Sequence, residues 1–406
     1  MDGGAGTAGI EVRELRDDGD RREAWALGRL AFGYGPAEAP PVALAPRAGV
    51  TRYGAFDASG RLVGKANDLH HDQWWQGRRL AAADIGGVAV LPEARGRGVA
   101  RAVLSRLLRD ARERGAAVSA LYPTVAAPYQ SYGWERVGAM RTLDTATAEL
   151  ARPRPSPKLV TRPGGRADLP ACADLYERIA RSRCGMLTRR GPLFDVAGDG
   201  DGLPDGIDGL TLVEDGDQLV GYARWRRGEG YRHGALLHVD DALAVTAEAA
   251  TELVGVLASW HSVAQVLRVR PLEGEATALR LPLEAAAEHD CARWMLRPVD
   301  AVRAVTDRGW PASARGAVEF VLEDELAPWN AGAWRLELAD GAGQLVPAAG
   351  QPGLYLSIRG FALLYAGTAR PHALQEAGLL RCESGADPAA LDLLAAGPPA
   401  QLLDYF

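Results

Sequence analysis

Residues 87–108 read GVAVLPEARGRGVARAVLSRLL. The stretch begins with an apolar run typical of a strand, passes through a loop rich in glycine and arginine, and continues into an amphipathic helix. Apolar residues recur in that helix at positions 100, 103, 104, 107, 108 and 111, and Gly115 stands where a C-terminal cap belongs. Such a loop favours an anionic ligand, because the unpaired amides and the positive dipole end of the helix point toward it.

Three patterns of anion-binding loop compete for this stretch. The GxxxxGK[ST] pattern for ATP is absent from it. The GxGxxG pattern of dinucleotide-binding folds fails, because Arg101 stands at its third glycine and LPEA separates the strand from the glycines. The pattern [R/Q]xxGx[G/A] is met by Arg95, Gly98 and Ala100. Because Gly96 and Gly98 have no side chain and Ala100 has only a methyl group, a diphosphate can approach the backbone amides closely. A basic loop that merely caps a helix is the alternative.

The composition describes a globular protein. With 406 residues, 47% of them apolar and 24% charged, the chain has material for two or three domains with their own cores. The formal charge of −6 gives no support for a nucleic-acid partner and is more compatible with a cationic or amine-bearing small substrate. Four widely spaced cysteines indicate neither a zinc site nor a disulfide framework, so we expect a reducing cytoplasm.

Other segments predict no membrane or metal association. The N-terminal residues contain no apolar signal-peptide core, and no apolar stretch approaches the length of a membrane span. His70 and His71 are adjacent, and adjacent strand residues point to opposite faces, so we expect them on the surface of a hairpin rather than in a metal site.

The order of predicted elements repeats once along the chain. A strand, a helix, a hairpin, a strand and a long helix precede the linker ARPRPSPK, residues 151–158, and a similar order follows it. The second copy has LAVTAEAAT, residues 243–251, in place of the glycine loop, so it lacks the features for binding an anion. Alternating strands and short helices after about residue 295 predict a third domain of the α+β class.

The stretch VAVLPEARGRGVARAVL resembles motif A of the GNAT superfamily of acyl-CoA-dependent N-acyltransferases. Together with ALYPTVAAPYQSYGWERVG, DELAPWNAGAWRL and an aromatic last residue, it makes nearly the whole chain similar to the enhanced intracellular survival (Eis) family. The resemblance implies an α/β and α+β fold with a catalytic GNAT domain at 1–150, a degenerate GNAT-like domain at 151–292 and a sterol-carrier-protein-like domain at 293–406. It also implies a cytoplasmic hexamer that acts on aminoglycosides, polyamines or lysine side chains.

The resemblance implies acetyl-CoA as cosubstrate, with no metal. Its pyrophosphate would lie on the glycine loop, and its pantetheine arm along the strand before the loop. The residues expected to bind it are Val88, Ala89, Val90, Arg95, Gly96, Arg97, Gly98, Val99, Ala100 and Arg101.

Two residues are expected to carry the chemistry. In PYQSYGW the family pattern places the general acid at Tyr129, and a phenol with a pKa of about 10 can protonate a thiolate whose conjugate acid lies near 8.5. Tyr132 is expected only to pack beside Trp134. The family's base is the α-carboxylate of the last residue, here Phe406, and the apolar end LLDYF predicts a terminus held against the protein.

We therefore expect an N-acetyltransferase in which an amine attacks acetyl-CoA directly within a ternary complex. Two alternatives stay open. One is a non-catalytic protein that binds acyl-CoA or lipid, and the other is a biosynthetic acyltransferase that uses a larger or carrier-bound acyl group.

Overall fold

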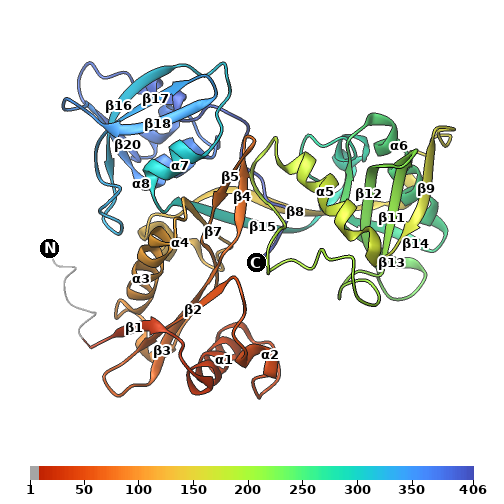
Figure 1. The fold of residues 1–406 in the computed structure, drawn as a ribbon, viewed down its shortest axis with the longest axis horizontal. Helices are drawn as coiled ribbons and strands as arrows, with labels where there is room; N and C mark the ends of the chain where they lie inside the picture. The colour runs from red at the N-terminus through yellow and green to blue at the C-terminus, as the bar shows by residue number, and fades with distance from the viewer. Residues whose placement is uncertain (1–8) are drawn as a thin grey trace.

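The computed structural model describes residues 9–406, which form sheets of twelve, three and five strands. Figure 1 shows three lobes, with the C-terminus between them near the centre of the molecule. The first eight residues of the expected first domain lie outside the described part of the chain. Within that part, no helix is long and apolar enough to cross a membrane.

The first lobe is a mixed sheet with helices on both faces. Its strands follow the order β1, β2, β3, β6, β7, β15 and β8 across the sheet. These strands are β1 (Glu11–Glu14), β2 (Val50–Phe56), β3 (Leu62–Leu69), β6 (Asp84–Val90), β7 (Val118–Leu121), β15 (Ala287–Pro298) and β8 (Glu135–Ala146). Its helices are α1 (Asp18–Phe32), α2 (Pro41–Leu44), α3 (Val99–Glu113) and α4 (Ala126–Ser131).

Helix α3 packs on one face of this sheet, and α1 and α2 pack on the other. The buried stripe of α3 is the predicted one, except that Val99 rather than Ala100 begins it. On β3, Asp68 points to the α3 face, where its carboxylate pairs with Arg114 at 2.9 Å. Because side chains alternate along a strand, Lys65 and Asn67 point to the face that α1 and α2 cover.

The second lobe continues the same sheet beyond β8. Its strands β14 (Ala264–Val269), β13 (Arg232–Ala244), β12 (Gln218–Arg227), β11 (Gly209–Asp215) and β9 (Leu159–Gly164) follow in that order. Its helices are α5 (Leu169–Ala180) and α6 (Ala247–Ser259). A small sheet of β10 (Cys184–Leu187), β4 (Asp72–Trp75) and β5 (Arg78–Ala81) ties the first two lobes together.

The third lobe is a five-stranded sheet with helices packed against it. Its strands are, in order across the sheet, β18 (Ala342–Pro347), β17 (Gly332–Ala339), β16 (Gly316–Glu323), β19 (Leu354–Ser357) and β20 (Leu380–Cys382). Its helices are α7 (Ala301–Asp307), α8 (Ile358–Tyr365) and α9 (Pro371–Glu376). The rings of Phe320, Phe361 and Tyr365 lie in its core, and this burial stabilises the lobe.

Two long-range connections bring the end of the chain to the first lobe. Strand β15, which runs from residue 287 to 298, contains the expected domain boundary between residues 292 and 293. It lies between β7 and β8 in the sheet of the first lobe. After the third lobe, the Gln401 amide donates to the Cys184 carbonyl at 2.8 Å, and the Leu402 and Leu403 side chains are buried. The last residues therefore run between the lobes toward β6 and β7.

Candidate active site

Strands β6 and β7 run parallel and separate soon after they meet. Within the described residues, Ile85 and Leu121 form the only ladder pair between them. On its other side β6 carries a bulge, because Gly87 and Val88 together oppose a single residue of β3. Gly87 has a φ of +62°, which favours glycine, and a Cβ there would lie 2.9 Å from the Asn67 amide nitrogen. The backbone of β6 beyond Ile85 is thus left open on the β7 side.

The glycine loop ends at the start of α3 in a conformation suited to an anion. Gly98 is the N-cap residue, with a φ of +76°, and no side chain caps the helix. The first-turn amides therefore remain available to a ligand. The corresponding helix of the second lobe differs, because the Thr246 hydroxyl accepts from the Ala249 amide and caps α6.

The other residues expected to bind the cosubstrate lie along this path. Val88, Ala89 and Val90 are on the open part of β6, and Arg95, Gly96 and Arg97 are exposed in the loop. Ala100 and Arg101 lie in the first turn of α3, with Arg101 exposed. The Val99 side chain is buried toward the sheet, so only its backbone can face a ligand there.

Tyr129 lies on α4, directly after β7. Its ring packs edge-on against Trp134, with 6.4 Å between the ring centroids, and the side chain is half-buried. No described residue hydrogen-bonds to its hydroxyl group. Burial, with a smaller contribution from Tyr132, raises the pKa of Tyr129 to about 12, so the phenol keeps its proton at neutral pH.

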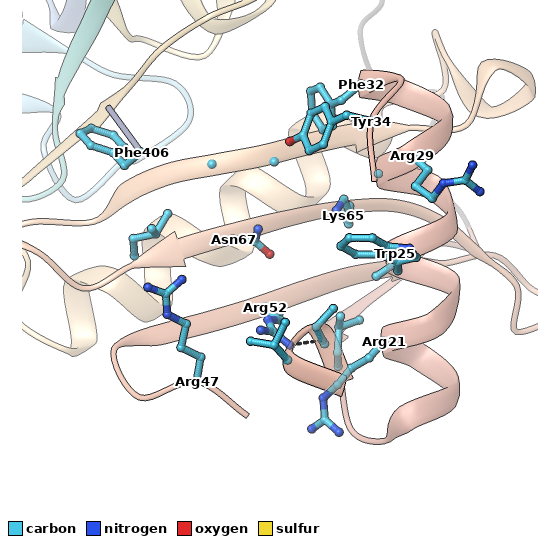
Figure 2. A pocket seen from close by; sticks show the side chains of 18 residues that line it. Arg21, Trp25, Arg29, Phe32, Tyr34, Arg47, Arg52, Lys65, Asn67 and Phe406 are labelled. Atoms are coloured by element: carbon cyan, nitrogen blue, oxygen red, sulfur yellow. Dashed lines mark hydrogen bonds between the residues drawn. The ribbon is translucent and has the colours of Figure 1, made fainter. Parts of the chain in front are cut away.

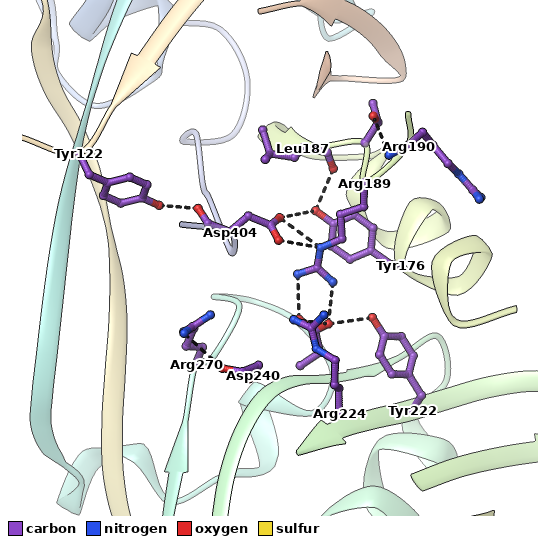
Figure 3. Close-up of polar contacts among 12 residues, drawn as sticks. Tyr122, Tyr176, Leu187, Arg189, Arg190, Tyr222, Arg224, Asp240, Arg270 and Asp404 are labelled. Carbon is purple, nitrogen blue, oxygen red and sulfur yellow. Dashed lines mark hydrogen bonds and ion pairs between the residues drawn. The ribbon is translucent and has the colours of Figure 1, made fainter. Parts of the chain in front are cut away.

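The end of the chain is anchored by a polar network that Figure 3 shows around Asp404. The Arg189 guanidinium donates to Asp404 at 2.9 Å and to Asp241 at 2.6 Å, and it is almost fully buried. The Tyr122 hydroxyl donates to the Asp404 carbonyl at 2.8 Å, and the Tyr405 ring lies against the Tyr122 ring. Burial works against the charge on Asp241, but Arg189 beside it holds the pKa of that carboxyl well below its usual range.

Phe406 reaches a cavity of about 460 Å³ on the α1 and α2 face of the first lobe. Its carbonyl carbon lies 3.8 Å from the point where a side chain on Gly86 would begin, so the terminus reaches β6 where the strands separate. Figure 2 shows Phe406 at one side of this cavity, with Lys65 and Asn67 between it and Trp25. Tyr129 does not line the cavity, so the structure does not place the two predicted catalytic residues in one pocket.

The expectation that His71 lies on a hairpin surface is wrong. Its side chain is buried, and Nδ1 lies 3.0 Å from the Asp84 carboxylate, which also accepts from the Ala120 amide. The His71 ring packs against the Phe406 ring, with 5.4 Å between centroids. Among the described residues, no group of three or more His, Cys, Asp and Glu residues could hold a metal ion. The His71 ring, which Asp84 contacts, instead packs against the last residue, and no local pattern in the sequence indicates that contact.

Family models match all three lobes. Residues 11–137 and 185–298 each match an acetyltransferase (GNAT) domain, and residues 301–402 match a sterol carrier protein domain. An uncharacterised N-acetyltransferase of Streptomyces avermitilis is 30% identical over 328 residues, which cover 75% of this chain and 76% of that protein. A second uncharacterised N-acetyltransferase, of Streptomyces coelicolor, is 29% identical with the same coverage.

The chain belongs to the GNAT superfamily of N-acetyltransferases. The expected fold of two GNAT-like units followed by a sterol-carrier-like domain is therefore confirmed. GNAT domains use acetyl-CoA as their cosubstrate, and the open β6 edge and uncapped α3 of the first unit suit it.

Solved structures agree over the whole length of this GNAT enzyme. A GCN5-related N-acetyltransferase from Kribbella flavida has a TM-score of 0.82 and 27% identity, covering 99% of this chain and 100% of that one. Eis1 from Mycobacterium abscessus has a TM-score of 0.74 and 23% identity, covering 98% of this chain and 100% of its own. At 23% identity, the likeness to Eis1 concerns the fold.

Proposed function

We propose that this enzyme transfers an acetyl group from acetyl-CoA to an amine bound in the cavity beside Phe406, by direct attack within a ternary complex. The observation that carries the proposal is the position of Phe406, whose carbonyl carbon lies beside Gly86 where β6 leaves β7. An amine in that cavity would lie next to β6, the strand along which we place the pantetheine arm of the cosubstrate.

The first unit alone would hold the cosubstrate. The amides at the start of α3 and the loop residues Arg95, Arg97 and Gly98 would bind the pyrophosphate. The β6 backbone at Val88 and Val90 would accept the pantetheine arm. In the second unit, the Thr246 hydroxyl already accepts a hydrogen bond from one of the equivalent amides, so we expect one coenzyme A site per chain.

The transfer itself needs a proton acceptor and a proton donor. The Phe406 carboxylate takes one proton from the ammonium group of the acceptor, directly or through a water molecule, and leaves a neutral nitrogen. That nitrogen forms a bond to the acetyl carbon, the carbon–sulfur bond of the thioester breaks, and Tyr129 donates its phenolic proton to the thiolate. The nitrogen then loses its second proton to solvent, and Tyr129 takes a proton back from solvent. The pKa of about 12 keeps Tyr129 protonated at neutral pH. Loss of contact with water would raise the basicity of the thiolate toward that of the phenol and so favour the transfer.

The test is to move the terminal carboxylate without changing the residues that pack. Adding a short polar tail after Phe406 converts its carboxylate to an amide, while the Arg189–Asp404 contact remains. We expect kcat to fall by about 10²-fold or more. The value of kcat is measured as thiol release from acetyl-CoA, with aminoglycosides, polyamines, lysine peptides and amino acids as acceptors.

Normal turnover by the extended enzyme at unchanged thermal stability would contradict the role of Phe406. Binding of acetyl-CoA without turnover of any amine would instead favour the non-catalytic or biosynthetic alternatives. The hexamer stays a prediction, which light scattering tests.

A further inference from the structure

The cavity beside Phe406 is lined by basic side chains. Arg21, Arg29, Arg47, Arg52 and Lys65 all contribute to its wall. None of the described lining residues is an aspartate or glutamate, so their acidic groups are limited to the α-carboxylate of Phe406. Figure 2 shows Arg47, Arg52 and Arg21 along one side of the cavity, with Lys65 toward its middle. The net charge of the whole chain is −6, so this local charge is opposite to the average.

Neighbouring carboxylates do not neutralise most of these charges. Arg52 donates to the carbonyls of Ala43 and Ala45, at 2.7 and 3.1 Å, and Arg29 donates to the Gly35 carbonyl at 3.1 Å. Arg21 pairs with the exposed Asp18 at 3.2 Å.

Arg47 and Lys65 have no ion-pair partner among the described residues. Lys65 is half-buried, and its Nζ would lie only 2.8 Å from a Cβ on Gly28, so α1 covers it.

Lysine is rare in this chain, and its presence in the cavity costs stability. Of the 46 lysines and arginines, only Lys65 and Lys158 are lysines. Burial, and to a smaller extent Arg52, lowers the pKa of Lys65 to about 8. An unpaired ammonium group under these conditions destabilises the free enzyme, whereas an anion beside it would remove the penalty.

We propose that the acceptor is an amine that also carries an anionic group, a carboxylate or a phosphate, which binds between Lys65, Arg47 and Arg52. The inference rests on the proposed acetyltransferase function and names its substrate class. Free amino acids and amino sugar phosphates have this chemistry. Trp25, Phe32 and Tyr34 add an aromatic wall that can contact the rest of such a molecule.

The charge of the cavity disfavours polycationic acceptors. An aminoglycoside or polyamine would place several ammonium groups among unpaired guanidinium groups, and like charges destabilise one another. For an amine whose anionic group holds it in place, the same cations lower the pKa of its ammonium group. That shift makes the neutral nucleophile more abundant near neutral pH.

The basic cavity is separate from the proposed pyrophosphate site. Arg95, Arg97 and Arg101 are not among the residues that line it. Lys65 points to the face of α1 and α2, whereas α3, which begins at the glycine loop, packs on the opposite face of the sheet. An anion bound by Lys65, Arg47 and Arg52 would therefore lie apart from the pyrophosphate of coenzyme A, as the anionic group of an acceptor would.

The experiment compares kcat/KM on matched amines with and without an anionic group. The pairs are glucosamine phosphate against glucosamine and phenylalanine against its amide, with spermidine and kanamycin as polycations. We expect a preference of at least about tenfold for the anionic member of one pair. Lys65→Met and Arg47→Gln should reduce it severalfold, whereas Arg22→Gln, an exposed neighbour on α1 outside the lining, should not.

Each other outcome has a defined meaning. Equal or better turnover of uncharged or polycationic amines overturns the inference and leaves the acetyltransferase proposal intact. A tenfold increase in the KM for acetyl-CoA in Lys65→Met, with the acceptor KM unchanged, assigns the cations to coenzyme A and also overturns it. If no amine is acetylated although acetyl-CoA binds, both proposals fail.

Discussion

Replacing Lys65 with methionine should stabilise the free enzyme, although Lys65 belongs to the proposed substrate site. The pKa of Lys65 is about 8, against an ordinary value of 10.5. At 1.36 kcal/mol per pH unit, this difference corresponds to a penalty of about 3 kcal/mol for the charged form in the fold. Methionine is one atom shorter than lysine, keeps an unbranched side chain and removes the charge. We expect the variant to gain about 1–3 kcal/mol at pH 7, because relaxation around the ammonium group reduces the full value.

The pH dependence distinguishes this cause from improved packing. Below pH 8 Lys65 is charged in both the folded and the unfolded states, so the wild-type enzyme carries the whole penalty. Between pH 8 and about 10.4 the unfolded chain still holds a proton that the folded enzyme has lost, so the free energy of unfolding rises with pH. The gain from Lys65→Met should therefore shrink over this range.

Urea unfolding at pH 7, 8.5 and 10 measures the effect, with Lys158→Met in the exposed linker as the matched control. Labelling lysine with ¹³C at Cε gives two side-chain signals, whose titration reports both pKa values directly. Titration of Lys65 near 10, or a loss of stability in Lys65→Met at pH 7, would refute the reasoning.

Four further substitutions test the proposed machinery. Tyr129→Phe should lower kcat by 10²–10⁴-fold without changing acetyl-CoA affinity, and Tyr132→Phe should cost little; the reverse pattern would make Tyr132 the acid. Gly98→Val should weaken acetyl-CoA binding at least tenfold, about 1.4 kcal/mol, because valine disfavours a φ of +76°. Calorimetry that finds two sites per chain would contradict the single-site proposal. Arg189→Met should cost about 3–5 kcal/mol of stability and also lower kcat, because Asp241 loses its buried partner; normal kcat would show that the terminus needs no such anchor.

Local patterns in the sequence predicted the glycine loop and α3. The left-handed Gly98, the buried stripe of α3 and the end of that helix before Gly115 depend on residues close together in the chain. The position of β15 could not be predicted in this way. It pairs with β7 and β8 across more than a hundred residues, and such pairing leaves no local signal.

The same limit applies to the site around the end of the chain. His71 is buried because its partners are Asp84 and the distant Phe406 ring, and the adjacent-histidine pattern contains neither contact. The basic cavity collects charges from α1, β2, β3 and the loop after α2. The net charge of −6 suggested a cationic substrate, but the average over the chain says nothing about a cavity to which Arg47 and Lys65 contribute unpaired charges.

The proposed base and the basic cavity are chemically linked. An α-carboxylate has a reference pKa of about 3.3–3.7, so it accepts a proton poorly from a lysine-type ammonium group with a pKa near 10.4. A peptide-type α-amine with a pKa of about 7.7–8.0 reduces that difference by about 3 kcal/mol. In an acceptor that carries an anion, the anion stabilises the ammonium group, and pairing of that anion with the cations of the cavity offsets this effect and lowers the pKa of the amine. Amines of low basicity that carry an anion are therefore the acceptors for which the Phe406 carboxylate is an adequate base.

This linkage predicts the pH profile of kcat/KM on an anionic amine. The rate should rise as the acceptor loses its proton, and it should fall again as Lys65 loses its proton near pH 8, because the free enzyme then binds the anion less well. In Lys65→Met the alkaline fall should disappear while the acidic rise remains. An alkaline fall that persists in this variant would assign it to another group and remove Lys65 from anion binding.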